Sequence, residues 1–194
     1  MTKVRVLMFF LTTLTFFAYR VYADPPDNDY ALTLPAALSP GEARSRILAA
    51  ADNYEHTPYR LGGLDGNGLD CSGLVYLSFL DALGVSIPRS AWNLFSWSEK
   101  ISINDACPGD LVFFTTTGNG NITHVGIFAG DGRFIHAASE GPETGVIYSG
   151  LDERYWSRTF AGAGRLFPKA DIDNYSDNKM TAELSYSGDN RYDQ

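Results

Sequence analysis

The sequence has few cysteines, few histidines and too few basic residues to balance its acids. Its 194 residues include 2 Cys and 3 His, and 15 Lys and Arg stand against 23 Asp and Glu, which gives a net charge of −8. An acidic chain is poorly suited to attract nucleic acid or anionic lipid over long distances. We therefore expect neither of them to be a partner.

Long apolar runs are also scarce, apart from one at the N-terminus. Residues 6–19 are mostly apolar and follow Lys3 and Arg5, and Val21-Tyr22-Ala23 fits the small-x-small rule for signal cleavage. The run is shorter than the roughly 20 residues that span a bilayer, which disfavours the alternative of an uncleaved anchor helix. We predict a signal peptide at 1–23 and a periplasmic or secreted product without a membrane anchor after cleavage.

The remaining chain divides into three parts by composition. Residues 24–39 are rich in Pro and Asp and predict a flexible lead. Residues 40–167 carry the periodic apolar pattern and are enough for one domain with its own core. Residues 168–194 are polar and acidic without a sustained period, which predicts a disordered tail.

Helix signals fill the first half of the predicted domain. Ser39-Pro40-Gly41-Glu42 is a capping box, and the apolar spacing after it predicts a helix over 40–55. Four glycines within 57–69 predict a loop with positive φ angles. A second helix is expected from Cys71 to just before Gly84, and a short third one over 90–97.

Strand signals fill the second half, which gives an α+β order. Short β-prone runs occupy 111–114, 124–129, 133–138, 146–149 and 159–166. Asp131-Gly132 between two of them is a hairpin signal. We therefore expect the strands that carry His124 and His136 to be antiparallel neighbours.

Cys71 follows the glycine-rich segment and opens a helical run, within Asp70-Cys71-Ser72-Gly73-Leu74-Val75-Tyr76. A helix N-terminus offers unpaired N–H groups and the positive end of the macrodipole. We expect this position to stabilise the thiolate, which is the nucleophilic form of cysteine.

The two strand histidines complete a pattern typical of a thiol hydrolase. His124 is the candidate base, which forms an ion pair with the thiolate, and His136 is the candidate third residue that fixes the tautomer of His124. The backbone N–H of Cys71 and the Tyr59 hydroxyl are candidate oxyanion donors. Each of these residues taken singly could instead be an ordinary core residue, but the three together argue for chemistry.

The second cysteine and the histidines also permit structural readings. A Cys71–Cys107 disulfide would consume the nucleophile, and a domain of this size needs no such staple, so we expect Cys107 to be a free loop residue. A zinc site of Cys71, His124 and His136 lacks the paired ligand spacing of zinc sites. We expect no metal and no cofactor.

Several motifs, taken in their order along the chain, resemble those of the NlpC-type cell-wall cysteine peptidases. They are Thr57-Pro58-Tyr59-Arg60-Leu61-Gly62-Gly63, Asp70 to Val75, Ile87-Pro88-Arg89-Ser90, Pro108-Gly109-Asp110-Leu111-Val112-Phe113-Phe114, His124-Val125-Gly126-Ile127 and Ile135-His136-Ala137. Trp156, Arg158-Thr159-Phe160 and Gly164-Arg165-Leu166 also look like the closing strand of that family. The resemblance covers about residues 40–167.

This resemblance implies a papain-like α+β fold, with the nucleophile helix packed on a mostly antiparallel sheet. It also implies cleavage of peptidoglycan stem peptides between D-γ-glutamate and the diamino acid. Cys71, His124 and His136 match the catalytic positions of the family, and Tyr59 matches a tyrosine that flanks the nucleophile.

Four further positions carry over from the family with less defined roles. Asp70 and Ser72 match substrate contacts, although Asp70 could equally be the N-cap of the nucleophile helix. Arg89 and Ser90 are expected to shape the rim of the groove. The family often has a glutamine shortly after this segment, where this chain offers only Asn93.

Other functions remain open on the sequence. An N-acetylmuramoyl-L-alanine amidase or a cross-link peptidase would use the same Cys-His core, and a wall-degrading toxin would use the same site. A non-catalytic wall-binding module is a different class, and no catalytic position is missing to support it. For the peptidase itself we expect a monomer with peptidoglycan stem peptides as its substrate.

Overall fold

The computed structural model describes residues 38–166. The predicted signal peptide, nearly all of the predicted lead and the predicted tail lie outside the described residues. Within the described part, no helix combines the length and the apolar character needed to cross a membrane.

The three predicted helices are present, and each begins at a side-chain cap. Helix α2 (Pro40–Asp52) starts after Ser39, whose hydroxyl accepts the Glu42 N–H at 3.2 Å. Helix α4 (Ala91–Trp97) starts after Ser90, which accepts the Asn93 N–H. Helix α3 (Cys71–Leu83) starts after Asp70 and ends at Gly84, whose φ of 69° is the left-handed conformation typical of a helix C-terminus.

Six strands form one antiparallel sheet in the order β3-β8-β4-β5-β6-β7. Their bounds are β3 (Glu99–Ile101), β4 (Leu111–Phe114), β5 (His124–Gly130), β6 (Arg133–Ala138), β7 (Gly145–Gly150) and β8 (Phe160–Arg165). The turn at Asp131-Gly132 joins β5 to β6, as predicted. The two strands are antiparallel, and Ile127 lies opposite Ile135.

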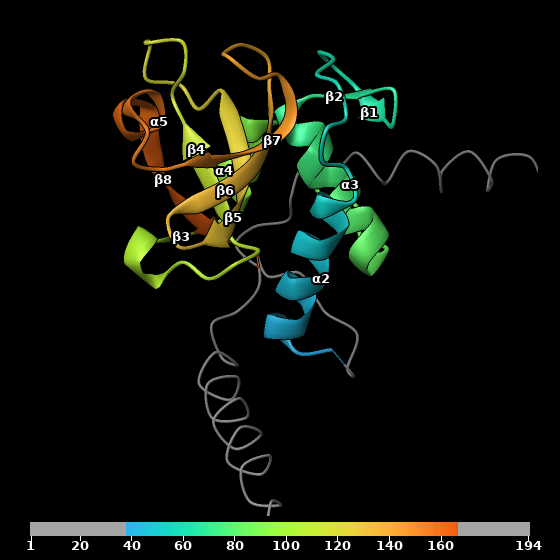
Figure 1. Ribbon diagram of the computed structural model, residues 1–194. Helices are drawn as coiled ribbons and strands as arrows, with labels where there is room; N and C mark the ends of the chain where they lie inside the picture. Colours follow the sequence, from blue (N-terminus) through green and yellow to red (C-terminus); the bar gives the residue numbers. More distant parts are fainter. Residues whose placement is uncertain (1–37, 167–194) are drawn as a thin grey trace, which may run out of the picture.

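The sheet is covered on both faces, so alternate residues of its strands enter two different cores. In Figure 1, α2 and α3 stand side by side against one side of the sheet, while the short helix α5 (Arg154–Thr159) lies on the other. In β4, Leu111 and Phe113 join the core under α2 and α3, whereas Val112 and Phe114 join a smaller core with Trp156 of α5. This arrangement matches the expected α+β papain-like fold.

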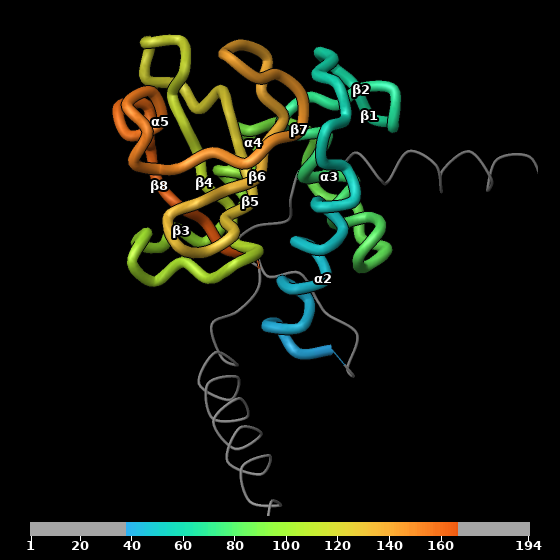
Figure 2. The backbone as a smooth tube through the Cα atoms, in the orientation of Figure 1, coloured from blue at the N-terminus to red at the C-terminus, as the bar shows by residue number. Residues whose placement is uncertain are grey.

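The tube in Figure 2 shows the glycine-rich segment as a projecting loop beside the start of α3. The predicted plain loop over 57–69 in fact contains a small hairpin of β1 (Leu64–Asp65) and β2 (Gly68–Leu69). Of its glycines only Gly62 has a positive φ, of 71°. Gly63 serves close packing instead, because a Cβ there would lie 2.2 Å from the Gly68 carbonyl oxygen.

Besides β1 and β2, three more short elements were not predicted from the sequence, namely β3, α5 and the 3-10 turn η2 (Ile103–Asp105). The expected closing strand begins at Phe160, so Trp156 and Arg158 belong to α5 and not to a strand. The expected end of α2 was also three residues too late.

The outer edge of β7 contacts the segment that follows α2. The His56 N–H donates to the Val146 carbonyl, and the Val146 N–H donates to the Thr57 carbonyl. Gly145 permits this approach, because a Cβ there would lie 2.5 Å from the Thr57 oxygen. Residues 56–57 therefore act as a short extension of the sheet and bring Tyr59 toward α3.

Candidate active site

Cys71 is the first residue of α3, and its thiol lies beside the start of β5. The sulfur accepts hydrogen bonds from the backbone N–H groups of Val125 and Ser72. Val125 directly follows His124, so packing of α3 against β5 brings the nucleophile candidate to the base candidate. The sequence predicted both residues, and the fold places the predicted nucleophile beside Val125, the residue that follows the predicted base.

The charge state of Cys71 differs from the sequence expectation. Burial raises the pKa of the thiol above its ordinary value of 9.0, the negative charge of Asp70 raises it further, and the Val125 and Ser72 N–H groups oppose the rise only in part. The resting cysteine is therefore a thiol. The prediction of a helix-stabilised thiolate was wrong because it omitted desolvation and the adjacent carboxylate.

His124 and His136 are joined by a direct hydrogen bond, with His124 Nε2 3.0 Å from His136 Nδ1. His136 is fully buried, and His124 lies partly buried at the first position of β5. Burial lowers the pKa of His124 to about 4, although the charge of Asp70 acts in the opposite direction. Burial and the neighbouring His124 hold the pKa of His136 well below its usual range. Both rings are neutral near pH 7.

Aromatic side chains fix the orientation of both imidazoles. Trp156 stacks on His124 at a centroid distance of 5.1 Å and meets His136 edge-on at 4.7 Å. Phe134 stacks on the other histidine, His136, at 4.8 Å. The sequence reasoning assigned Trp156 to a strand and so missed this contact, which keeps the rings away from solvent.

Ser149 is a further polar neighbour that the sequence gave no signal to find. Its hydroxyl lies 3.1 Å from His136 Nε2, and Ser149 is only 7 % exposed. Its position depends on the pairing of β6 with β7, which was not predicted.

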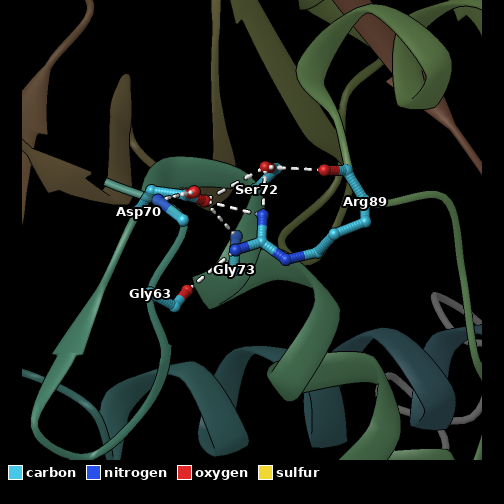
Figure 3. Close-up of polar contacts among 6 residues, drawn as sticks. Gly63, Asp70, Ser72, Gly73 and Arg89 are labelled. Atoms are coloured by element: carbon cyan, nitrogen blue, oxygen red, sulfur yellow. Dashed lines mark hydrogen bonds and ion pairs between the residues drawn. The ribbon is translucent and has the colours of Figure 1, made fainter. Parts of the chain in front are cut away.

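Asp70 uses its carboxylate to hold the start of α3 in place (Figure 3). Oδ1 accepts the Gly73 N–H at 2.7 Å, the Ser72 hydroxyl and the Arg89 guanidinium, while Oδ2 accepts the Gly62 N–H at 2.9 Å. Despite partial burial, the Arg89 and Gly73 hydrogen bonds hold its pKa below the ordinary value. These contacts support the N-cap role of Asp70 over that of a substrate contact.

Arg89 and Ser72 belong to the same group of contacts. The guanidinium pairs with Asp70 at 2.7 Å, donates to the Ser72 hydroxyl and donates to the Gly63 carbonyl at 2.8 Å. Figure 3 shows Arg89 reaching across the first turn of α3 toward the Gly63 loop. We call Asp70, Ser72, Gly73, Arg89 and Gly63 the helix-start clamp.

The last two predicted site residues occupy different places. Tyr59 lies near the thiol, since burial and the charges of Cys71 and Asp70 raise the pKa of its hydroxyl. It also forms an isolated parallel bridge with Leu69. Ser90 caps α4, and no contact within the described residues ties it to Cys71.

The sequence also raised two alternatives for these residues, a Cys71–Cys107 disulfide and a metal site. Cys71 and Cys107 are both free thiols in the structure. Among residues 38–166, no group of three His, Cys, Asp or Glu side chains is arranged to hold a metal ion.

Comparison with known proteins gives consistent matches. The NlpC/P60 family model matches residues 56–165. A "Probable endopeptidase" of Haemophilus influenzae is 34% identical over 135 residues, covering 69% of this chain and 82% of that protein. The "Gamma-DL-glutamyl hydrolase" of Bacillus subtilis is 39% identical over 130 residues, but the match covers 66% of this chain and only 31% of that protein.

A solved structure agrees with these matches. An NLP/P60 family protein of Staphylococcus aureus, described as similar to lipoprotein, superposes with a TM-score of 0.57 at 34% identity. The superposition covers 71% of this chain and 44% of the other. With a family match over more than half its length and the same fold around Cys71, this chain belongs to the NlpC/P60 family.

Proposed function

We propose that this chain is an exported cysteine endopeptidase that hydrolyses peptidoglycan stem peptides, at the bond between D-γ-glutamate and the diamino acid. Cys71 is the nucleophile, His124 the base and His136 the residue that orients it. The observation that carries this proposal is a pair of contacts at the start of β5: the Cys71 sulfur accepts the N–H of Val125, the residue after His124, and Nε2 of His124 lies 3.0 Å from Nδ1 of His136.

The chemistry follows from groups that are neutral at rest. Because Nε2 of His124 is engaged with His136, Nδ1 is the nitrogen left to take the thiol proton. The thiolate attacks the peptide carbonyl carbon, and the carbonyl oxygen becomes an oxyanion. The backbone N–H of Cys71 and the Tyr59 hydroxyl are the proposed donors to that oxyanion. Protonated His124 then gives its proton to the leaving amine, and water hydrolyses the thioester.

The names of the relatives support a wall substrate. The Bacillus subtilis relative is a gamma-DL-glutamyl hydrolase, and another protein of that organism, 41% identical over 122 residues, is a bifunctional muramidase/DL-endopeptidase. We carry the DL-endopeptidase activity over to this chain as part of the proposal. Export to the periplasm or the outside, action as a monomer and independence of cofactors belong to it as well.

A cross-link peptidase is the second candidate. An Escherichia coli relative, 33% identical over 129 residues, is named murein DD-endopeptidase MepS/murein LD-carboxypeptidase. That protein cleaves a different bond on the same kind of polymer, and the catalytic groups would be the same.

Digestion of purified muropeptides followed by mass spectrometry separates these activities. The proposal expects products with a free diamino-acid N-terminus, and none with the Cys71→Ala variant. Conversion of cross-linked dimers into monomers would establish the DD-endopeptidase instead, and peptides beginning with free L-alanine would establish an amidase. Cys107→Ser is the matched control, because it removes the other thiol and is expected to retain full activity. Intact muropeptides with wild-type protein would overturn the proposal.

A further inference from the structure

Ser149 stands at the far end of a hydrogen-bonded row that starts at the candidate base. Its Oγ lies 3.1 Å from Nε2 of His136, whose Nδ1 lies 3.0 Å from Nε2 of His124. Strand register fixes this row: Phe134 pairs with Ser149 and His136 pairs with Ile147, so Ser149 is the diagonal same-face neighbour of His136.

The direction of the hydrogen bonds along the row determines which nitrogen of His124 is unprotonated. A neutral imidazole has one N–H donor and one acceptor nitrogen. If Ser149 donates to His136, then His136 Nδ1–H donates to His124 Nε2, and the proton of His124 occupies Nδ1. If Ser149 accepts the hydrogen bond, His136 donates from Nε2–H and accepts at Nδ1 the Nε2–H of His124. Nδ1 of His124 then carries a lone pair. Only the second direction leaves His124 able to take a proton from Cys71.

We propose that Ser149 is a positioning residue whose hydroxyl oxygen accepts the Nε2–H of His136 and thereby holds His124 in the tautomer with an unprotonated Nδ1. This role rests on the proposed peptidase function. Ser149 touches neither the thiol nor the substrate in that scheme, and it acts through His136 alone.

The hydrogen bonds from His124 to His136 and from His136 to Ser149 keep the same donors and acceptors during the proton transfer. The S–H bond of Cys71 breaks as an N–H bond forms on Nδ1 of His124, which leaves a thiolate and an imidazolium. The imidazolium still donates from Nε2 to the lone pair on His136 Nδ1, and His136 still donates from Nε2 to Ser149. The imidazolium is therefore stabilised without any further proton movement.

The tautomers can be measured directly by ¹⁵N NMR of histidine-labelled protein near pH 7. The wild-type protein is expected to show protonated Nε2 and bare Nδ1 on both His124 and His136. In Ser149→Ala, we expect His136 to lose this preference and show a mixture of tautomers. A wild-type His136 protonated on Nδ1 would overturn the proposal. This measurement needs no substrate, so it stands even if the proposed hydrolysis fails.

Kinetics with a stem-peptide substrate test the consequence. Loss of one neutral hydrogen bond corresponds to a fall in kcat of about tenfold in Ser149→Ala, with KM nearly unchanged because no substrate contact is removed. Ser149→Thr keeps the hydroxyl and is expected to restore most of the activity.

Ser98→Ala provides the matched control. Ser98 is 4 % exposed, and its hydroxyl donates to the Phe95 carbonyl outside the site. We expect it to retain wild-type kcat even if it loses stability. Equal loss of kcat in Ser98→Ala and Ser149→Ala would assign the effect to general destabilisation and overturn the positioning role, as would unchanged kcat in Ser149→Ala. Should Ser149→Ala fail to fold, the wild-type tautomers and Ser149→Thr still decide the question.

Discussion

Burial determines the protonation state of individual side chains in this site. The Cys71 thiol and the His124 and His136 rings all have pKa values displaced toward the neutral form by burial. The proposed nucleophile is thus activated by proton transfer during the reaction. It does not rest as a thiolate.

The reactivity of Cys71 toward an alkylating reagent tests this state. The rate of modification by iodoacetamide in a Cys107→Ser background should keep rising with pH up to pH 9 without reaching a plateau, because the thiolate is the reactive form and its pKa is raised above the ordinary value. Mass spectrometry of the modified protein gives the rate. A rate that is already maximal and constant between pH 5 and 8 would contradict a resting thiol.

His124 also makes a prediction for stability in acid. Its pKa is about 4 in the folded protein against 6.5 when exposed, so protons favour the unfolded chain and stability is lost as the pH falls from about 6.5 toward 4. Between pH 7 and pH 4.5 this residue alone accounts for a loss of about 2 kcal/mol in the free energy of unfolding. Urea unfolding at both pH values should show that His124→Gln loses less than the wild type. Equal losses would refute the assignment.

At the scale of secondary-structure elements, the helix-start clamp couples α3 to the Gly63 loop. Asp70→Ala removes the N-cap and leaves Arg89 without its anion, which should lower the free energy of unfolding by about 2 kcal/mol. Urea unfolding measures this loss. We also expect a lower kcat, because Cys71 is the next residue.

Asp65→Ala is the matched control for the clamp. Asp65 also pairs with an arginine, Arg60 at 2.8 Å, but both side chains are about half exposed. We expect no measurable change in stability, since exposed ion pairs contribute little. A loss as large as that of Asp70→Ala would show that the clamp has no special role.

The elements differ in how well the sequence predicts them. Local chemistry predicted α3, because Asp70 and Gly84 are strong boundary residues, and it predicted the hairpin that joins the histidines through Asp131-Gly132. Helix α5 was missed because its six residues are too few to show a helical period. Ser149 was missed because its contact depends on the register between β6 and β7, which no single segment encodes.

At the scale of the whole molecule, one buried ion pair joins two neighbouring strands, β4 and β8, whose residues are far apart in the sequence. Arg165 at the end of β8 binds both carboxylate oxygens of Asp110, which precedes β4, at 3.1 and 2.7 Å, with each side chain 1 % exposed. Arg165→Met leaves Asp110 buried without its cation and should cost about 3–5 kcal/mol of stability.

The double variant Asp110→Asn/Arg165→Met is expected to be more stable than Arg165→Met alone, because it removes the unpaired charge. Thermal or urea unfolding of the three proteins checks this order. If the double variant were less stable than the single one, burial of an unpaired charge would not be the cause of the loss.

The two outer strands of the sheet have a consequence for the behaviour of the protein at high concentration. At one edge, both backbone groups of Val146 in β7 are occupied by His56 and Thr57. At the other edge, β3 has only three residues, and its Glu99 and Lys100 are charged and exposed. Short, charged or occupied edges are poor templates for pairing with a strand of another molecule. At the β7 edge, this protection against aggregation comes from the same segment that leads to Tyr59.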